Sequence, residues 1–113
     1  MTLVYKILPR ADWTAAQAVG VFAGAAIDLE DGYIHFSTAA QAQETARRHF
    51  AGQSDLLVLE VNGAALGEAL VWEVSRGGQL FPHLYGVLDV SLVRAVYEAP
   101  LGADGTPVLE GLA

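Results

Sequence analysis

Apolar and polar positions along the chain change period several times, and each period predicts a different element. β-Branched and aromatic residues fill positions 3–8 up to Pro9, which predicts a first strand, Leu3–Leu8. The residues from Asp55 to Val61 are apolar on both faces, a pattern typical of a central strand covered on both sides. Four shorter runs predict further strands: Tyr33–Phe36, Ala69–Val74, Val93–Ala99 and, at a sheet edge, Pro107–Leu109.

Capping residues and apolar periodicity predict two helices. Asp12 is a good N-cap for a short helix, Trp13–Val19. Thr38 and Gln41 have the spacing of a Thr-x-x-Gln capping box at the start of a longer helix, Ala39–Phe50. The helices therefore fall early in the chain and most of the strands fall late.

The remaining segments lack a regular period. Small residues and Gly24 in Phe22–Asp31 predict a loop, and Asp89–Ser91 predicts a short helical turn. Pro82 and the flanking glycines keep Gly78–Gly86 from forming a regular helix. The resulting order, β-α-β-α-β-β-β, predicts an α+β fold. We expect one small domain over residues 1–113, with a twisted, mostly antiparallel sheet and two main helices.

Composition and charge exclude several functional classes. The net charge of −7, from 6 basic and 13 acidic residues, argues against non-specific binding to nucleic acid, which requires clustered Lys and Arg. The lack of cysteine excludes disulfides and thiol nucleophiles. No signal peptide is recognisable and no apolar run approaches the ~20 residues that cross a bilayer. We therefore expect a cytoplasmic protein without membrane contact.

A first polar cluster, Asp31–Thr38, places His35 just before the start of the longer helix. Free backbone N–H groups at a helix start suit an anionic or carbonyl oxygen of a ligand. Ser37 and Thr38 would then add hydroxyl groups to such a site. The alternative is that Thr38 only caps the helix and His35 makes a buried hydrogen bond.

A second polar cluster holds His83 and Tyr85 within Gly78–Gly86. The two glycines before Phe81 allow the backbone to pass close to a ligand or to another strand. The alternative is a tight loop in which the histidine and the tyrosine satisfy each other. If the two clusters meet in space, His35 and His83 share one site with groups that bind and move protons.

Other polar residues are weighed in the same way. Glu73 lies between apolar residues of a predicted strand, either on a solvated face or in a site. Arg76 follows three residues later and would either pair with Glu73 or bind an anionic ligand. No histidine spacing requires a metal, so no metal site is expected. We interpret His49 as structural, and Trp13 and Trp72 as core residues.

Several segments of the chain, taken together, resemble the DUF952 family of small, mostly bacterial proteins. They are Tyr5–Ile7, Asp31–Thr38, His49–Phe50, Trp72–Glu73 and Phe81–Gly86. That family is named for having no known function. It is grouped with the ADP-ribosyltransferase-like fold, which includes poly-ADP-ribose polymerases, toxins and tRNA 2′-phosphotransferases.

The resemblance implies roles for matching residues. His35 corresponds to the histidine that contacts the nicotinamide-side ribose of NAD, and Ser37 or Thr38 to a hydroxyl residue that helps hold the amide. Tyr85 is a possible counterpart of a later tyrosine, and Glu73 or Glu98 of a glutamate. Phe36 departs from the pattern, because many such enzymes have a small residue there.

The expected function is therefore binding of a nucleotide related to NAD or ADP-ribose, or ADP-ribosyl transfer with NAD as substrate. Catalytic roles are predicted for Glu73, His35 and His83, and ligand-binding roles for Ser37, Thr38, Arg76, Phe81 and Tyr85. The alternative is a non-catalytic module that binds a small ligand or a protein and keeps the cleft without the chemistry. A structural role as a partner or dimer subunit is a third option.

Overall fold

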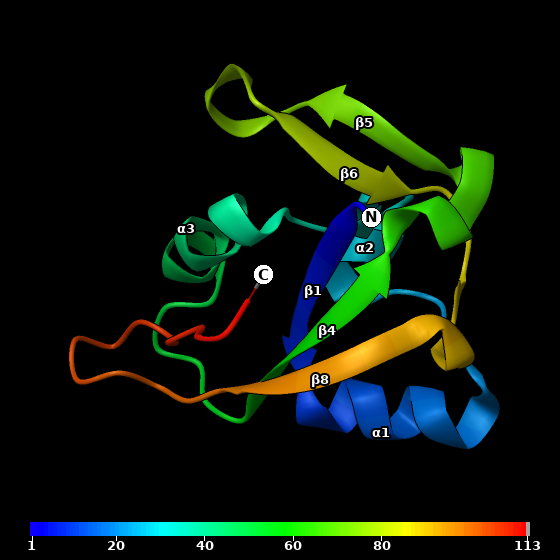
Figure 1. The fold of residues 1–113 in the computed structure, drawn as a ribbon. Helices are drawn as coiled ribbons and strands as arrows, with labels where there is room; N and C mark the ends of the chain where they lie inside the picture. Colours follow the sequence, from blue (N-terminus) through cyan, green and yellow to red (C-terminus); the bar gives the residue numbers. More distant parts are fainter. Residues whose placement is uncertain (113) are drawn as a thin grey trace.

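The strands of this chain form three antiparallel sheets instead of the single sheet that we expected (Figure 1). The computed structural model describes residues 1–112. One sheet has the order β1 (Leu3–Pro9), β4 (Leu56–Asn62), β8 (Val93–Ala99). A second has the order β3 (Ile34–His35), β6 (Leu80–Leu84), β5 (Leu70–Val74). The third pairs β2 (Val21–Phe22) with β7 (Leu88–Asp89).

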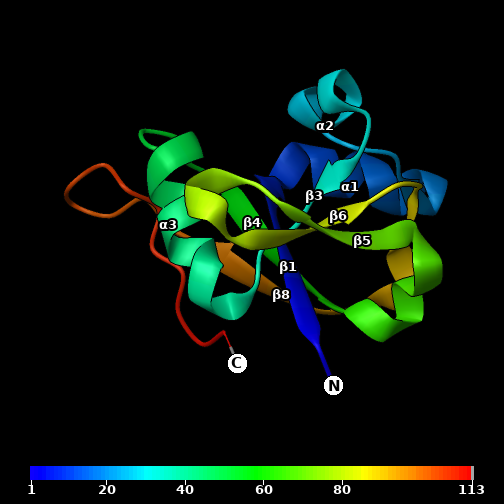
Figure 2. The same cartoon turned by 90° about the horizontal axis from the view of Figure 1, so that it is seen from above.

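The helices are α1 (Arg10–Val19), α2 (Ala26–Asp31) and α3 (Ala39–His49). Short 3₁₀ turns lie at Gly63–Ala69, Arg76–Gly78 and Val90–Leu92, the last close to the predicted turn. Seen from above, α3 lies to the left of the strands and α2 at the top, and the tip of the β5–β6 hairpin reaches toward α3 (Figure 2). The radius of gyration of 13.0 Å matches the ~13 Å expected of a compact chain of this length. The α+β prediction is confirmed.

The predicted central strand is confirmed as β4, which pairs with β1 on one side and β8 on the other. Its residues from Leu56 to Val61 are all buried. Leu57, Leu59 and Val61 belong to a core that includes Trp13 of α1. Leu56 and Val58 belong to a second core, together with Ala46 of α3. The strand therefore has an apolar layer on each face, as its sequence predicted.

The two predicted helices are present, with one correction. Helix α1 begins at Arg10, and its N-cap is Pro9, so Asp12 lies in the first turn and is not the cap. Proline has a fixed φ, here −61°, that suits both the end of a strand and the entry to a helix. The capping box of α3 is confirmed, because Thr38 Oγ1 accepts from Gln41 N at 3.2 Å.

The segment predicted as a loop contains α2, so that part of the prediction is wrong. The helix is only six residues long and has no capping side chain at Ala25. Asp28 holds it instead, because its Oδ2 accepts from the N–H of Ala25 at 2.8 Å. Gly24, with φ of +125°, leads into the helix, and a Cβ at this position would lie 3.0 Å from the Asp28 Cβ. The glycine therefore lets the chain pass close to Asp28.

The segment Gly78–Gly86, interpreted as irregular, contains β6, the middle strand of its sheet. Pro82 is tolerated there because of its position relative to β3. The carbonyl of Pro82 accepts from Phe36 N at 3.0 Å and therefore faces the β3 side. The nitrogen of Pro82 faces the same side, at a point just beyond the end of β3 at His35. The missing N–H therefore breaks no ladder bond to β5.

Two further predictions are wrong. Pro107–Leu109 is not a strand, because only an isolated bridge joins Pro107 to Leu101. Trp72 is not a core residue, since 38% of it is exposed on the edge strand β5, whereas Trp13 is 7% exposed. Among residues 1–112, no helix is long and apolar enough to cross a membrane.

Candidate functional site

The two polar clusters of the sequence meet on neighbouring strands. His35 of β3 and His83 of β6 are direct partners in the antiparallel register, and their ring centroids lie 5.7 Å apart. Ile34 and Leu84, which alternate with them, are buried in the core. The histidine side chains therefore lie together on the opposite face of the sheet.

His83 is held by a carboxylate on β5. Its Nδ1 lies 2.8 Å from Oε1 of Glu73, and the hydroxyl of Tyr85 donates to the same oxygen at 2.7 Å. The hydrogen bonds from Tyr85 and His83 lower the pKa of Glu73. The ring of Tyr33 stacks on the imidazole with centroids 4.1 Å apart.

The second ring nitrogen of His83 is available to a ligand. Nε2 has no hydrogen-bond partner among residues 1–112, although His83 is only 4% exposed. Within this range, no fully buried side-chain nitrogen or oxygen lacks a partner. Nε2 therefore reaches the solvent of the adjoining cleft. An imidazole oriented through Nδ1 by a carboxylate, with Nε2 open, suits proton transfer.

His35 has a carboxylate at each ring nitrogen. Nδ1 lies 2.6 Å from Oδ1 of Asp28, and Nε2 lies 2.9 Å from Oδ2 of Asp31. A ring that donates from both nitrogens satisfies both acceptors. Asp28 is 1% exposed, whereas the Asp31 side chain is 39% exposed at the end of α2.

Asp28 is the residue that sequence analysis missed. Besides His35 Nδ1, its carboxylate accepts from Lys6 Nζ at 2.9 Å, from His35 N at 3.1 Å and from Ala25 N. Burial alone would raise the pKa of Asp28, but the His35 hydrogen bond and the Lys6 charge outweigh it and lower the pKa to about 2. Burial lowers the pKa of Lys6, and Asp28 opposes that shift. The only signal in the sequence was the Lys within the first predicted strand.

A cleft of about 670 Å³ adjoins the histidines. Residues of β1, α2, β3, α3 and β6 line it, which is why distant segments of the chain contribute to one site. Five of the predicted site residues line the cleft: His35, Ser37, Arg76, Phe81 and His83. Glu73, Tyr85 and Thr38 are not among the lining residues. Glu73 and Tyr85 instead support His83.

Arg76 lies at the cleft as a cation without an acidic partner. Its guanidinium carbon is 4.8 Å from the centroid of the Phe81 ring, and Nη1 donates to Thr45 Oγ1 at 3.3 Å. Burial and the neighbouring charge of Arg48 lower the pKa of Arg76. Within residues 1–112, each of the other cationic side chains has a carboxylate partner: Lys6, Arg10, Arg47, Arg48 and Arg94. Arg76 is therefore the cation that an anionic ligand can engage.

The two hydroxyl residues before α3 are engaged with the protein. Ser37 Oγ lies 3.0 Å from Thr45 Oγ1, and the Ser37 backbone pairs with that of Tyr5. Thr38 caps α3. Their ligand-binding roles stay predictions. Among the described residues, no three histidine or carboxylate side chains are arranged to hold a metal ion.

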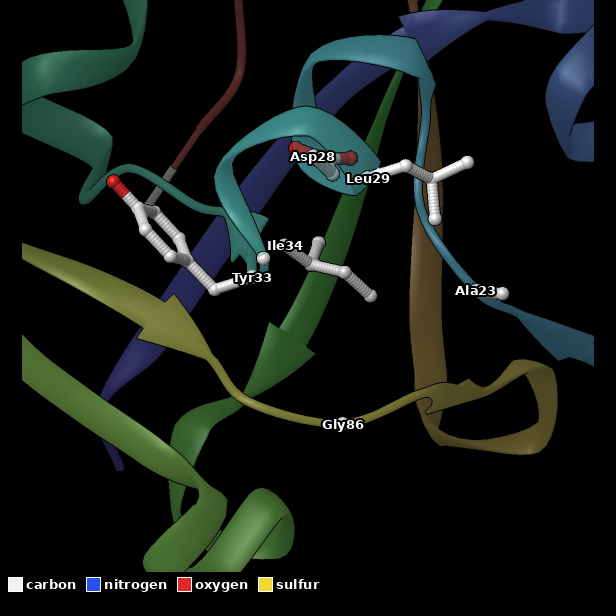
Figure 3. Close-up of a pocket in the computed structure, with 7 residues that line it drawn as sticks. Ala23, Asp28, Leu29, Tyr33, Ile34 and Gly86 are labelled. Carbon is white, nitrogen blue, oxygen red and sulfur yellow. The ribbon is translucent and has the colours of Figure 1, made fainter.

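A smaller pocket of about 160 Å³ shares the lining residue Tyr33 with the larger cleft (Figure 3). Asp28, Leu29 and Ile34 line it together with three small residues, Ala23, Gly32 and Gly86. Only Asp28 and Tyr33 bring polar side chains to it, and the Asp28 carboxylate already bonds to His35 and Lys6. We therefore place the candidate site in the larger cleft.

The lowered pKa of Asp28 predicts a stability change in acid. A carboxyl group whose folded pKa is about 2, against an ordinary value of 3.8, stabilises the fold above the ordinary value and loses that contribution as the pH falls. We expect about 2 kcal/mol of the free energy of unfolding to be lost from this group between about pH 5 and about pH 2. Urea unfolding across this pH range measures the loss. Over the same pH range, the free energy of unfolding of Asp28→Asn should fall by about 2 kcal/mol less than that of the wild type. Equal losses in the two proteins would contradict the lowered pKa of Asp28.

Comparison with known proteins places the chain among relatives without an assigned activity. The family model for DUF952, described as a protein of unknown function, matches residues 7–96. A crystal structure of protein CC0527 from Caulobacter crescentus is 56% identical, with a TM-score of 0.93, over 96% of this chain and 95% of that one. Its solution NMR structure is 56% identical, with a TM-score of 0.84, over 95% and 92%. No curated protein matches.

Proposed function

Because the chain belongs to the DUF952 family, we propose its function from the cleft itself: it binds a small nucleotide of the NAD or ADP-ribose class and acts on it in an ADP-ribosyl-transfer-like reaction. The observation that carries the proposal is Arg76, a cation without a carboxylate partner among residues 1–112, at the cleft that His35 and His83 also line. Phosphate is the group of such a ligand that a guanidinium binds best.

Each side chain takes a role that its contacts support. Arg76 binds a phosphate, and His35 holds the ribose when a ribose hydroxyl replaces the exposed Asp31 carboxylate at Nε2. His83 accepts a proton from the acceptor through Nε2, while Glu73 orients the imidazole through Nδ1. The ring of Tyr33 covers the imidazole and lines the cleft. Membership of the ADP-ribosyltransferase-like fold group is part of this proposal and rests on analogy.

A second candidate is a binding module that has no chemistry. Two contacts favour it. Oε1 of Glu73 accepts hydrogen bonds from both His83 and Tyr85. This oxygen is therefore not free to stabilise the positive charge that develops on the ribose during ADP-ribosyl transfer. Phe36, 2% exposed, fills the place where many transferases have a small residue. Consumption of NAD by the purified protein, lost in Glu73→Gln, separates the enzyme from the module.

Arg76→Ala is expected to weaken ADP-ribose binding by about 10- to 100-fold, because a charge-assisted hydrogen bond to phosphate contributes about 1.5–3 kcal/mol. Isothermal titration calorimetry of the purified protein measures the affinity. Arg48→Ala is the matched control, since Arg48 is an exposed arginine paired with Glu44. If both variants bind ADP-ribose as the wild type does, Arg76 is not the phosphate ligand.

A further inference from the structure

The proposed transfer reaction uses the open Nε2 of His83 but gives His35 no part in proton transfer. His83 has an open Nε2, whereas His35 meets a carboxylate oxygen at both ring nitrogens. We propose that they form a general base and a general acid that hydrolyse a phosphodiester, with a nucleoside 2′,3′-cyclic phosphate as the substrate class. This inference rests on the proposed nucleotide site, because it uses the same cleft and the same phosphate ligand.

The spacing of the rings suits two proton transfers at one phosphate. An in-line displacement places the attacking and the leaving oxygen on opposite sides of phosphorus, so base and acid must approach from two directions. His35 and His83 lie on adjacent strands with ring centroids 5.7 Å apart, and both line the cleft. The planes of the two rings are 67° apart, so the rings meet edge to face and do not stack.

The hydrogen bonds of each ring assign the roles. A base requires a nitrogen without a proton that faces the substrate, which fits Nε2 of His83, since Glu73 accepts at Nδ1. An acid requires a proton to give, which fits His35, whose Nε2 faces an oxygen of Asp31. The Asp31 oxygen lies 2.9 Å from Nε2 and belongs to an exposed side chain. We place the leaving oxygen of the substrate at the position that this oxygen occupies in the structure.

The rest of the cleft fits a nucleotide that carries one anionic phosphodiester. Arg76 offers a guanidinium at the cleft, stacked on Phe81, which lies two positions before His83 on β6. The nearby hydroxyl of Thr45 accepts from Arg76 at 3.3 Å, a contact that helps to orient the guanidinium. The ring of Tyr33, which also lines the cleft, offers an aromatic surface for a base or a ribose.

The step needs no reactant other than water. His83 Nε2 takes a proton from water, and the water oxygen forms a bond to phosphorus. The bond from phosphorus to one ribose oxygen breaks, and that oxygen receives the proton from Nε2 of His35. The product is a nucleoside monophosphate with one free hydroxyl, and a proton passes from His83 to His35 through solvent to reset the pair.

The test incubates the full-length protein with adenosine 2′,3′-cyclic phosphate and follows the monophosphate by chromatography and phosphorus NMR. We expect hydrolysis that falls by about 100-fold or more in His35→Asn and in His83→Asn. Asparagine keeps a donor near the Nδ1 position, toward Asp28 or Glu73, and lacks the group at Nε2. Gln replacements at both positions are the second pair of variants, and thermal unfolding checks that each variant folds.

Arg48→Ala is the control, because Arg48 is exposed, pairs with Glu44 and does not line the cleft. It should keep wild-type hydrolysis. The wild-type rate should show two limbs against pH, with one limb removed in each Asn variant. The charged and titratable groups around the pair are Asp28, Asp31, Glu73, Tyr33 and Tyr85, with Lys6 behind Asp28 and His49 coupled electrostatically to His35.

The outcomes separate this inference from the proposed function. Hydrolysis that persists in folded His35→Asn and His83→Asn overturns the acid–base pair. ADP-ribose binding that depends on Arg76, without hydrolysis of the cyclic phosphate, overturns the inference and leaves the proposed nucleotide site in place. Absence of both binding and hydrolysis overturns both proposals. Hydrolysis lost only in the His35 and His83 variants supports the pair.

Discussion

Replacing Asp28 by alanine should lower the free energy of unfolding by about 3–5 kcal/mol at neutral pH, the range found when one partner of a buried ion pair is removed. Lys6 and Asp28 are both almost fully buried, and the pair is 2.9 Å long. Without the carboxylate, the Lys6 amine loses its buried partner, and the backbone N–H groups of Ala25 and His35 lose their acceptor. Urea unfolding of the wild type and Asp28→Ala measures the difference.

Two variants show whether the loss comes from the buried charge. Asp31→Asn is the matched control, because Asp31 also bonds to His35 but is exposed, and we expect a change within about 0.5 kcal/mol. Lys6→Met should lose less stability than Asp28→Ala, since Asp28 keeps three other hydrogen bonds. A loss in Asp28→Ala as small as that in Asp31→Asn would contradict the role given to this residue.

The parts of the fold that the sequence predicts well are those where local and tertiary signals agree. Helix α3 has a capping box at Thr38 and an apolar stripe that includes Ala42 and Ala46, and both signals lie within its own residues. Strand β4 is apolar on both faces because it is central, and the bounds predicted for β8, Val93–Ala99, match those observed.

The parts that the sequence misses depend on residues far away. Helix α2 is too short to show a period, and its Asp28 is held by Lys6, 22 positions earlier. Strand β6 contains Pro82, which ordinarily argues against a middle strand. It is allowed only because β3 ends opposite it, a fact that no local pattern contains.

The candidate site, like the fold, was predictable where the signal is local and not where it depends on distant residues. Residue types and clustering were enough to select His35 and His83, and the register of β3 and β6 brings them together. The partners of these histidines were not predictable from spacing. Glu73 was predicted to be catalytic, but its bonds to His83 and Tyr85 could not be read from the sequence, and Asp28 was expected to lie in a loop. Which carboxylate faces which ring nitrogen is a property of the packed sheets.

The last prediction concerns the two tryptophans. Both were predicted to be core residues, but only Trp13 is buried in the structure. Trp13, 7% exposed, packs from α1 into the core that covers β4, together with Leu8 and Leu59. Trp13→Ala should lower the free energy of unfolding by about 3–5 kcal/mol, from lost burial and from the cavity that remains.

Trp72→Ala is its matched control. Trp72 is 38% exposed on an edge strand and pairs with Pro82 across the hairpin, so we expect a loss below about 1 kcal/mol. Urea unfolding of both variants by circular dichroism measures the two losses without relying on tryptophan fluorescence. Equal losses would mean that the outer face of the β5–β6 hairpin is buried in solution, and the core would then extend beyond the layers on either side of β4.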